Sequence, residues 1–415
     1  MKKVIKKNKT KPAQRKKCQK KREIRKNKKD KNLSLKEGLK KTKEDKVLLN
    51  LCEPLKNIRS LIRDIFNLKE AKNQIKFLGV DIKYISRHID DNFFERCATK
   101  LGQIYETINS NKNHRDKKDL YFQFSKQYNR MVPHQYSIIN IDSYLINSEI
   151  KIKRELRILE LLKSYKELKL KDQKIRAEIR EDNNSINLNE SVNLSVNNNE
   201  MSVDEENLSN FSSQYYKKAL NETDYLFNLI DRKSQEFEKI KKLLYRYSVE
   251  NKCPYPKLKL LQLYRLSNKY KEFKEYENLY WYGCASPHLY SILRHGLRFP
   301  IVLPEQNIYK FGKGILISHN PYTQLQYCLP KSNTAYLFVC GNNGLKSKVV
   351  HSIHPDYPEK KKGRYDSVCI QHKIKLLMDE DDSEDFDLDY DIYCDYIVYD
   401  IDKINLLYLA KIEIP

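Results

Sequence analysis

The chain has 415 residues, 40% of them hydrophobic and 32% charged, and its formal net charge is +24. This length allows two domains with tails, and the hydrophobic fraction excludes a chain that is disordered throughout. No apolar run is long enough to cross a bilayer and no N-terminal segment resembles a signal peptide, so we expect neither a membrane protein nor a secreted one.

Residues 1–45 are predicted to form a disordered basic tail. Positions 1–32 contain 17 Lys and Arg against only Glu23 and Asp30, so much of the net charge lies in this tail. Such a run binds phosphate backbones or serves as a nuclear import signal. The alternative is a tail that only improves solubility.

Residues 46–172 are predicted to form a helical bundle. Their apolar residues recur at helical spacing, as at Leu55, Ile58, Ile62 and Ile65, and again at Phe94, Cys97, Leu101, Ile104 and Ile108. Residues 173–213 become polar and rich in Asn, Ser and Glu, without periodicity, which predicts a flexible linker.

Residues 214–415 are predicted to form a mixed domain, so the fold class is α+β. Short runs rich in Tyr, Ile and Val predict strands at "NLYWYG", "GILIS", "AYLFVCG", "DYIVYD" and "LLYLAKIEI". The acidic tract from Asp379 to Asp391 has no calcium-loop spacing and is interpreted as a solvated loop.

The cysteines give no sign of a metal site or a disulfide framework. The sequence has 9 Cys and no C-x-x-C spacing. This pattern favours a reducing compartment, the nucleus or the cytosol, and predicts no metal ligand set.

Three ordered motifs resemble the poly(ADP-ribose) polymerase (PARP) family of ADP-ribosyltransferases. They are "YWYGCA", "FGKGILISHNPYTQLQYC" and "DYIVYDIDKINLLYLAKIEI". The helical segment is similar to the regulatory domain that precedes the catalytic domain in the DNA-dependent members. Those members usually carry a Trp-Gly-Arg domain, and some carry zinc fingers, whereas the only Trp here is Trp281.

The resemblance implies that NAD+ is the substrate and assigns roles to the motif residues. Gly283 matches the Gly whose backbone binds the nicotinamide amide, and Tyr327 matches the Tyr that stacks on the ring. Gln324 stands where the family has a Ser that contacts the amide, and Arg298 matches an Arg on the adenosine side.

Three positions depart from the family pattern of His, Tyr and Glu. Tyr282 stands for the His, Leu316 for the Tyr and Asp395 for the Glu. The Glu stabilises the positive charge that develops as the glycosidic bond breaks, and a misplacement of about 1 Å can cost on the order of a hundredfold in rate. The alternative is that Tyr282 and Tyr327 are core aromatics and Asp395 an ordinary carboxylate at a strand end.

These residues leave three hypotheses for function. The favoured one is a nuclear PARP-like protein with weak or lost transferase activity, which contacts nucleic acid through residues 1–32. The second is an active NAD-dependent ADP-ribosyltransferase that modifies proteins or nucleic acids in DNA repair. The third is an RNA-associated nucleolar factor whose basic tail is the functional part. Under the first two, protein acceptors are expected partners and a membrane is not.

Overall fold

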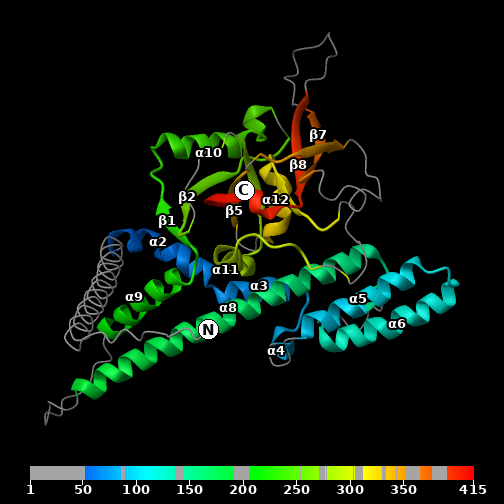
Figure 1. Cartoon of the computed structure of the whole chain (residues 1–415), viewed down its shortest axis with the longest axis horizontal. Coiled ribbons are helices and arrows are strands. Elements are labelled where there is room, and N and C mark those ends of the chain that lie inside the picture. Colours follow the sequence, from blue (N-terminus) through cyan, green and yellow to red (C-terminus); the bar gives the residue numbers. More distant parts are fainter. Residues whose placement is uncertain are drawn as a thin grey trace, which may run out of the picture. The chain divides into compact units, whose positions relative to one another are not determined.

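Helices come first along the chain, and a sheet with further helices packed on it follows (Figure 1). The computed structural model describes residues 52–85, 89–90, 92–135, 144–190, 205–252, 254–270, 276, 278–301, 303, 312–329, 333–342, 344–350, 365–375 and 390–415. The predicted basic tail and most of the predicted acidic loop lie outside these residues. The chain divides into two units, residues 1–57 and residues 58–415, and the sheet belongs to the second.

The helices before the sheet confirm the predicted helical character of this region. They are α2 (Cys52–Ile65), α3 (Leu68–Phe77), α4 (Ile82–Ile85), α5 (Phe93–Asn109), α6 (His114–Met131), α8 (Glu149–Glu190) and α9 (Glu205–Asn221). Asn67 and Asn113 cap the N-termini of α3 and α6, because each side chain accepts a hydrogen bond from the backbone N–H three residues later.

Helix α8 is longer than the sequence predicts. Residues 173–190 continue it without interruption, and 205–213 belong to α9. The expected flexible linker over 173–213 is therefore wrong for these two stretches, whereas 191–204 lie outside the described residues.

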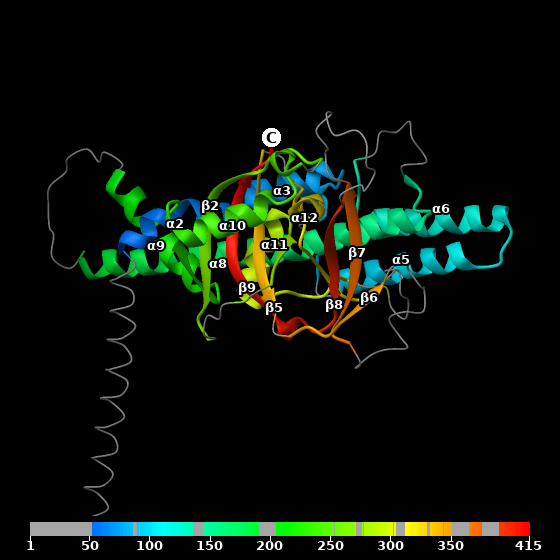
Figure 2. The ribbon, with the colours of Figure 1, turned by 90° about the horizontal axis from the view of Figure 1, so that it is seen from above.

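Buried side chains explain why α8 continues. Ile175 and Ile179 extend the buried row that includes Leu168, so the helical spacing of apolar residues persists beyond the expected boundary. The Tyr215 hydroxyl of α9 donates a hydrogen bond of 2.5 Å to Asp172 of α8. In Figure 2, α8 passes α9 near one end and α5 near the other, and it packs against both.

The described part of the second half contains a 9-stranded sheet with the order β1-β2-β9-β5-β3-β4-β8-β7-β6. The strands are β1 (Tyr225–Leu229), β2 (Lys259–Asn268), β3 (Leu279–Gly283), β4 (Ile315–Ser318), β5 (Thr334–Asn342), β6 (Ser347–Val350), β7 (Ser367–Lys375), β8 (Tyr390–Val398) and β9 (Ile404–Glu413). Pairing is antiparallel except between β6 and β7. The α+β fold class is thus confirmed.

Three helices accompany the sheet: α10 (Gln235–Tyr245), α11 (Ser286–His295) and α12 (Pro321–Cys328), with 3-10 turns at Val249–Asn251 and Ile401–Lys403. Phe237 of α10 and Cys328 of α12 share one buried cluster with Trp281 of β3. Helix α11 packs against α3 and α8. No described helix combines the length and hydropathy that a bilayer crossing requires.

Candidate functional site

A cavity of about 670 Å³ lies between α8 and the part of the sheet that carries the three motifs. Its wall on the α8 side is polar and includes Arg157, Glu160, Ser164 and Glu167. Its opposite wall includes six residues singled out by the sequence, namely Tyr282, Gly283, Arg298, Leu316, Gln324 and Tyr327. Motifs far apart in the sequence therefore meet at one cavity.

Gly283 ends β3 where the strand touches α12. A Cβ atom at this position would lie 2.1 Å from the backbone oxygen of Gln324, so the close approach requires Gly. Asn320 caps the N-terminus of helix α12, since its side chain accepts a hydrogen bond from the Tyr322 N–H, and Pro321 takes the first helical position. These local features fix α12 against β3.

Gln324 turns its side chain toward Gly283 rather than toward solvent. The residue is 1% exposed, and its Oε1 accepts a hydrogen bond of 3.0 Å from the Gly283 N–H. Its Nε2 has no hydrogen-bond partner among the residues that the structure describes.

Tyr282 and Leu316 reach the cavity from neighbouring strands. The Tyr282 ring lies 6.4 Å from the Phe338 ring of β5. Burial raises the pKa of the Tyr282 phenol well above 10.0, so the phenol is a neutral group that can donate a hydrogen bond. Leu316 pairs with Ile397 of β8 in the strand register, and both line the cavity. This stretch of wall is therefore aliphatic.

Asp395 does not line the cavity. It pairs with Ser318 in the register of β4 and β8 and lies two residues before Ile397 on β8. Because strand residues two apart face the same side, Asp395 lies on the cavity side of the sheet but farther along the strand. Burial raises the pKa of its carboxyl, whereas hydrogen bonding to Ser318 and the charge of His372 act in the opposite direction.

His372 of β7 is the neighbour of Asp395 that sequence reasoning missed. Its Nε2 lies 3.0 Å from Asp395 Oδ2, and its ring stacks on Tyr393 with centroids 4.8 Å apart. His372 belongs to none of the three sequence motifs. It lies close to the Asp395 carboxylate because β7 pairs with β8. The carboxylate is thus engaged within the sheet.

Helix α8 contacts two of the predicted ligand-binding residues. Arg157 donates a hydrogen bond of 2.8 Å to the Gln326 carbonyl oxygen, and its guanidinium lies 5.4 Å from the centre of the Tyr327 ring. Arg298 pairs with Glu167 at 3.0 Å. Charged groups of α8 therefore occupy the surroundings of both Tyr327 and Arg298.

Two further contacts join α8 to the opposite wall. Glu160 accepts a hydrogen bond of 2.8 Å from the Ile301 N–H, and burial raises the pKa of this carboxyl to about 7. The Ser164 hydroxyl lies 2.8 Å from His288 Nδ1, and burial lowers the pKa of His288 to about 4, so the ring is neutral. In the sequence, Arg157, Glu160, Ser164 and Glu167 form a polar row at helical spacing. The pattern of apolar residues does not reveal this row.

Cys284 follows Gly283 and also lines the cavity. Burial raises the pKa of its thiol well above 9.0. A buried neutral thiol is a poor nucleophile, so the geometry gives no support to cysteine chemistry at this position.

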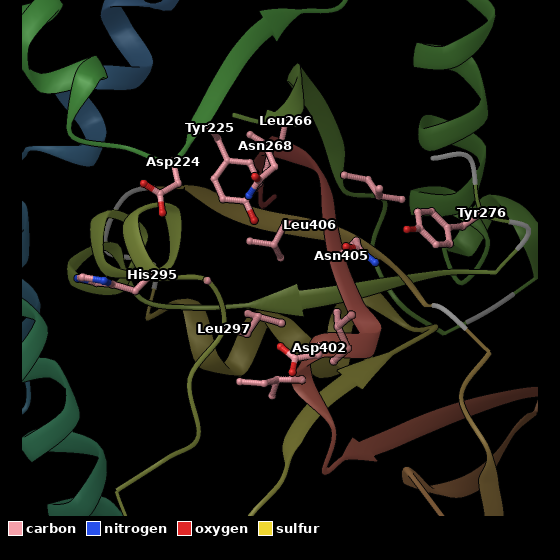
Figure 3. A pocket seen from close by; sticks show the side chains of 14 residues that line it. Asp224, Tyr225, Leu266, Asn268, Tyr276, His295, Leu297, Asp402, Asn405 and Leu406 are labelled. Carbon is pink, nitrogen blue, oxygen red and sulfur yellow. The ribbon is translucent and has the colours of Figure 1, made fainter. Parts of the chain in front are cut away.

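A second cavity, of about 200 Å³, lies beside the end of α11 and strands β1, β2 and β9 (Figure 3). Tyr225 and Asn268 lie close together on one side and His295 lies on another (Figure 3). Asp224 pairs with Arg294 at 2.5 Å. None of the seven predicted residues lines this cavity. No group of three or more possible metal ligands occurs among the described residues.

Comparison with known proteins gives two family matches in the order of the two structural regions. Residues 52–191 match the poly(ADP-ribose) polymerase regulatory domain, and residues 234–414 match the poly(ADP-ribose) polymerase catalytic domain. Helix α8, with the polar wall, falls within the first match, and the sheet from β2 onward falls within the second.

Individual relatives are distant. Poly(ADP-ribose) polymerase of Drosophila melanogaster is 25% identical over 212 residues, which are 44% of this chain and 20% of the relative. Poly(ADP-ribose) polymerase 1 of Gallus gallus is 25% identical over 207 residues, 45% of this chain and 20% of the relative. The alignments thus span about a fifth of each relative's length. With both domain matches in sequence order and together covering most of its length, the chain belongs to the poly(ADP-ribose) polymerase family.

Proposed function

We propose that this protein binds NAD+ in the cavity between α8 and the sheet and transfers ADP-ribose from it weakly or not at all. The observation that carries this proposal is the separation of the binding residues from the carboxylate. Gly283, Gln324 and Tyr327 line the cavity, whereas Asp395 lies beyond its wall next to His372.

The cavity has the size and composition of a ligand site. Its volume of about 670 Å³ lies within the usual range for small-molecule pockets, roughly 300–1,000 Å³. Arg298 offers a cation for the phosphates or the adenosine side, and the Tyr327 ring offers a stacking surface. Both are partly engaged by α8, so ligand binding competes with the contacts of Arg157 and Glu167.

The reaction requires a carboxylate close to the nicotinamide ribose. As the bond from the ribose to the nicotinamide breaks, positive charge builds on the sugar, the nicotinamide leaves and an acceptor oxygen or nitrogen attacks the same carbon. Asp395 is one methylene shorter than Glu, and its Oδ2 lies 3.0 Å from His372 Nε2 rather than at the cavity. A displacement of about 1 Å costs on the order of a hundredfold in rate, which supports weak or lost activity.

The cellular setting is part of the same proposal. We assign the protein to the nucleus, with nucleic acid as the partner of residues 1–32 and proteins as acceptors of any transferred ADP-ribose. The charge of the tail supports nucleic-acid binding through counterion release. The fly and chicken relatives are named as polymerases; for this chain we propose no more than transfer.

Restoring the three divergent positions tests the proposal. The full chain carrying Tyr282→His, Leu316→Tyr and Asp395→Glu should modify itself from labelled NAD+ at least on the order of a hundredfold faster than the wild type. Each single reversion should raise the rate less, because the three residues serve the same reaction: one binds NAD+, one forms the wall of the nicotinamide pocket and one stabilises the positive charge.

The control variant carries Tyr282→His and Leu316→Tyr together with Asp395→Asn. Its rate of transfer should return to that of the wild type, because the amide of Asn carries no charge. A wild type that transfers ADP-ribose as fast as the triple variant would show that the divergence is not limiting. A folded triple variant that neither binds NAD+ nor transfers ADP-ribose would contradict the proposal and show that residues other than these three close the cavity to NAD+.

A further inference from the structure

Gln324 brings a primary amide to the end of the cavity where the Gly283 N–H lies. Its Oε1 accepts a hydrogen bond from that N–H at 3.0 Å. The side-chain group of Gln is the same functional group, a carboxamide, that nicotinamide carries on its ring. The protein's own amide therefore already makes the hydrogen bond that an amide ligand would make with Gly283.

The surroundings hold this amide in place. Gln324 is 1% exposed, and its backbone packs so closely on Gly283 that a Cβ atom there would lie 2.1 Å from the Gln324 backbone oxygen. Gln324 also lines the cavity, so a change of its side-chain rotamer toward the cavity would release the Gly283 N–H.

The NH2 group of the Gln324 side chain lacks a hydrogen-bond partner among the described residues. Its nitrogen, Nε2, is buried. A buried donor without a partner is rare and costly, and it marks a place where an acceptor fits. The hydrogen bonding of this amide is therefore incomplete at Nε2, as expected for a group that yields its place to a ligand or contacts one.

We propose that Gln324 is an internal occupant of the amide-binding end of the cavity, which a ligand carboxamide must displace to reach the Gly283 N–H. This makes Gln324 a specificity-determining residue that weakens the binding of nicotinamide and of NAD+. The identity of the ligand rests on the proposed function, whereas the displacement itself rests on the contacts of Gln324.

Nicotinamide binding to the full chain tests this inference without requiring turnover. Calorimetric titration compares the wild type with Gln324→Ser, which removes the carboxamide and frees the Gly283 N–H. The variant should bind nicotinamide about tenfold more tightly, the effect of one hydrogen bond that no longer has to be broken. Gln324→Glu should bind it more weakly than the wild type, because a carboxylate is a stronger acceptor for the Gly283 N–H.

Two controls isolate the effect. Gln326→Ser makes the same substitution at an exposed position of the same helix and should leave nicotinamide affinity unchanged. Pyridine, which lacks the carboxamide, should bind the wild type and Gln324→Ser equally. If Gln324→Ser does not fold, as judged by circular dichroism and the fluorescence of the single Trp281, Gln324→Ala makes the same comparison.

Each outcome decides the inference. A folded Gln324→Ser or Gln324→Ala variant whose nicotinamide affinity equals or falls below that of the wild type overturns it, as does nicotinamide binding to neither protein. Tighter nicotinamide binding by the variant supports the displacement of Gln324. If no ADP-ribose transfer accompanies it, the inference stands and only the proposed transferase activity is contradicted.

Discussion

Replacing Glu160 with Gln should change how the stability of the protein depends on pH. Glu160 accepts a hydrogen bond from the Ile301 N–H, and burial raises its pKa from 4.5 to about 7. A folded-state pKa above the unfolded-state value favours the protonated form on folding. This contribution to stability is therefore fully present below pH 4.5 and is lost as the pH rises through about 7.

The magnitude follows from the size of the shift. Each pKa unit corresponds to about 1.4 kcal/mol, so a shift from 4.5 to about 7 gives at most about 3 kcal/mol. Glu160 lines the cavity and keeps some contact with solvent, and screening by that solvent reduces the expected effect to about 1–2 kcal/mol. Gln keeps an acceptor for the Ile301 N–H, so the substitution removes mainly the charge.

Urea unfolding of the full chain at pH 5 and pH 8 measures this effect. The free energy of unfolding of Glu160→Gln, relative to the wild type, should rise by about 1–2 kcal/mol between the two pH values. Glu181→Gln, the same change at an exposed position of α8, should show no such rise. Parallel pH dependences of Glu160→Gln and the wild type would refute the reasoning about Glu160.

Three further outcomes are expected. Deleting residues 1–32 should weaken binding to duplex DNA and RNA and flatten its salt dependence, measured by fluorescence anisotropy; an unchanged salt slope would contradict the role of the tail. His372→Ala should lower the free energy of unfolding at pH 8 by about 1–3 kcal/mol, and adding Asp395→Asn should recover part of this loss, since the buried charge is gone. Purely additive effects would argue against that pairing. Glu167→Gln should release Arg298 and tighten ADP-ribose binding a few-fold in calorimetry, whereas weaker binding would speak against competition with α8.

The sequence predicted the strands that carry the motifs but not the whole sheet. Strands β3, β4, β5, β8 and β9 are short apolar or aromatic runs. The residues of each strand are therefore enough to predict it as a strand. In β7 the polar residues Gln371, His372 and Lys373 interrupt the apolar run, and β2 mixes Lys, Gln and Arg with Leu. These strands are specified by their neighbours in the sheet, which the pattern of residues along the chain does not reveal.

The candidate site was predictable only on its sheet side. Tyr282, Gly283 and Leu316 end up together because β3 and β4 are adjacent in the sheet, and family motifs mark all three. The wall from α8 depends on contacts between residues far apart in the sequence, such as Arg157 with the Gln326 carbonyl. The spacing of polar residues along α8 does not predict which distant part of the chain they will contact.

The position of β9 in the sheet sets an order for biosynthesis. β9 lies between β2 and β5, although both precede it in the chain. On the ribosome, these two strands cannot be joined until residues 404–413 have emerged, so the sheet assembles late and through contacts of long sequence separation. Until then the inner edges of β2 and β5 stay unpaired and open to association with other chains. Ribosome-bound chains that stop before residue 404 should therefore depend on chaperones more than chains that include β9.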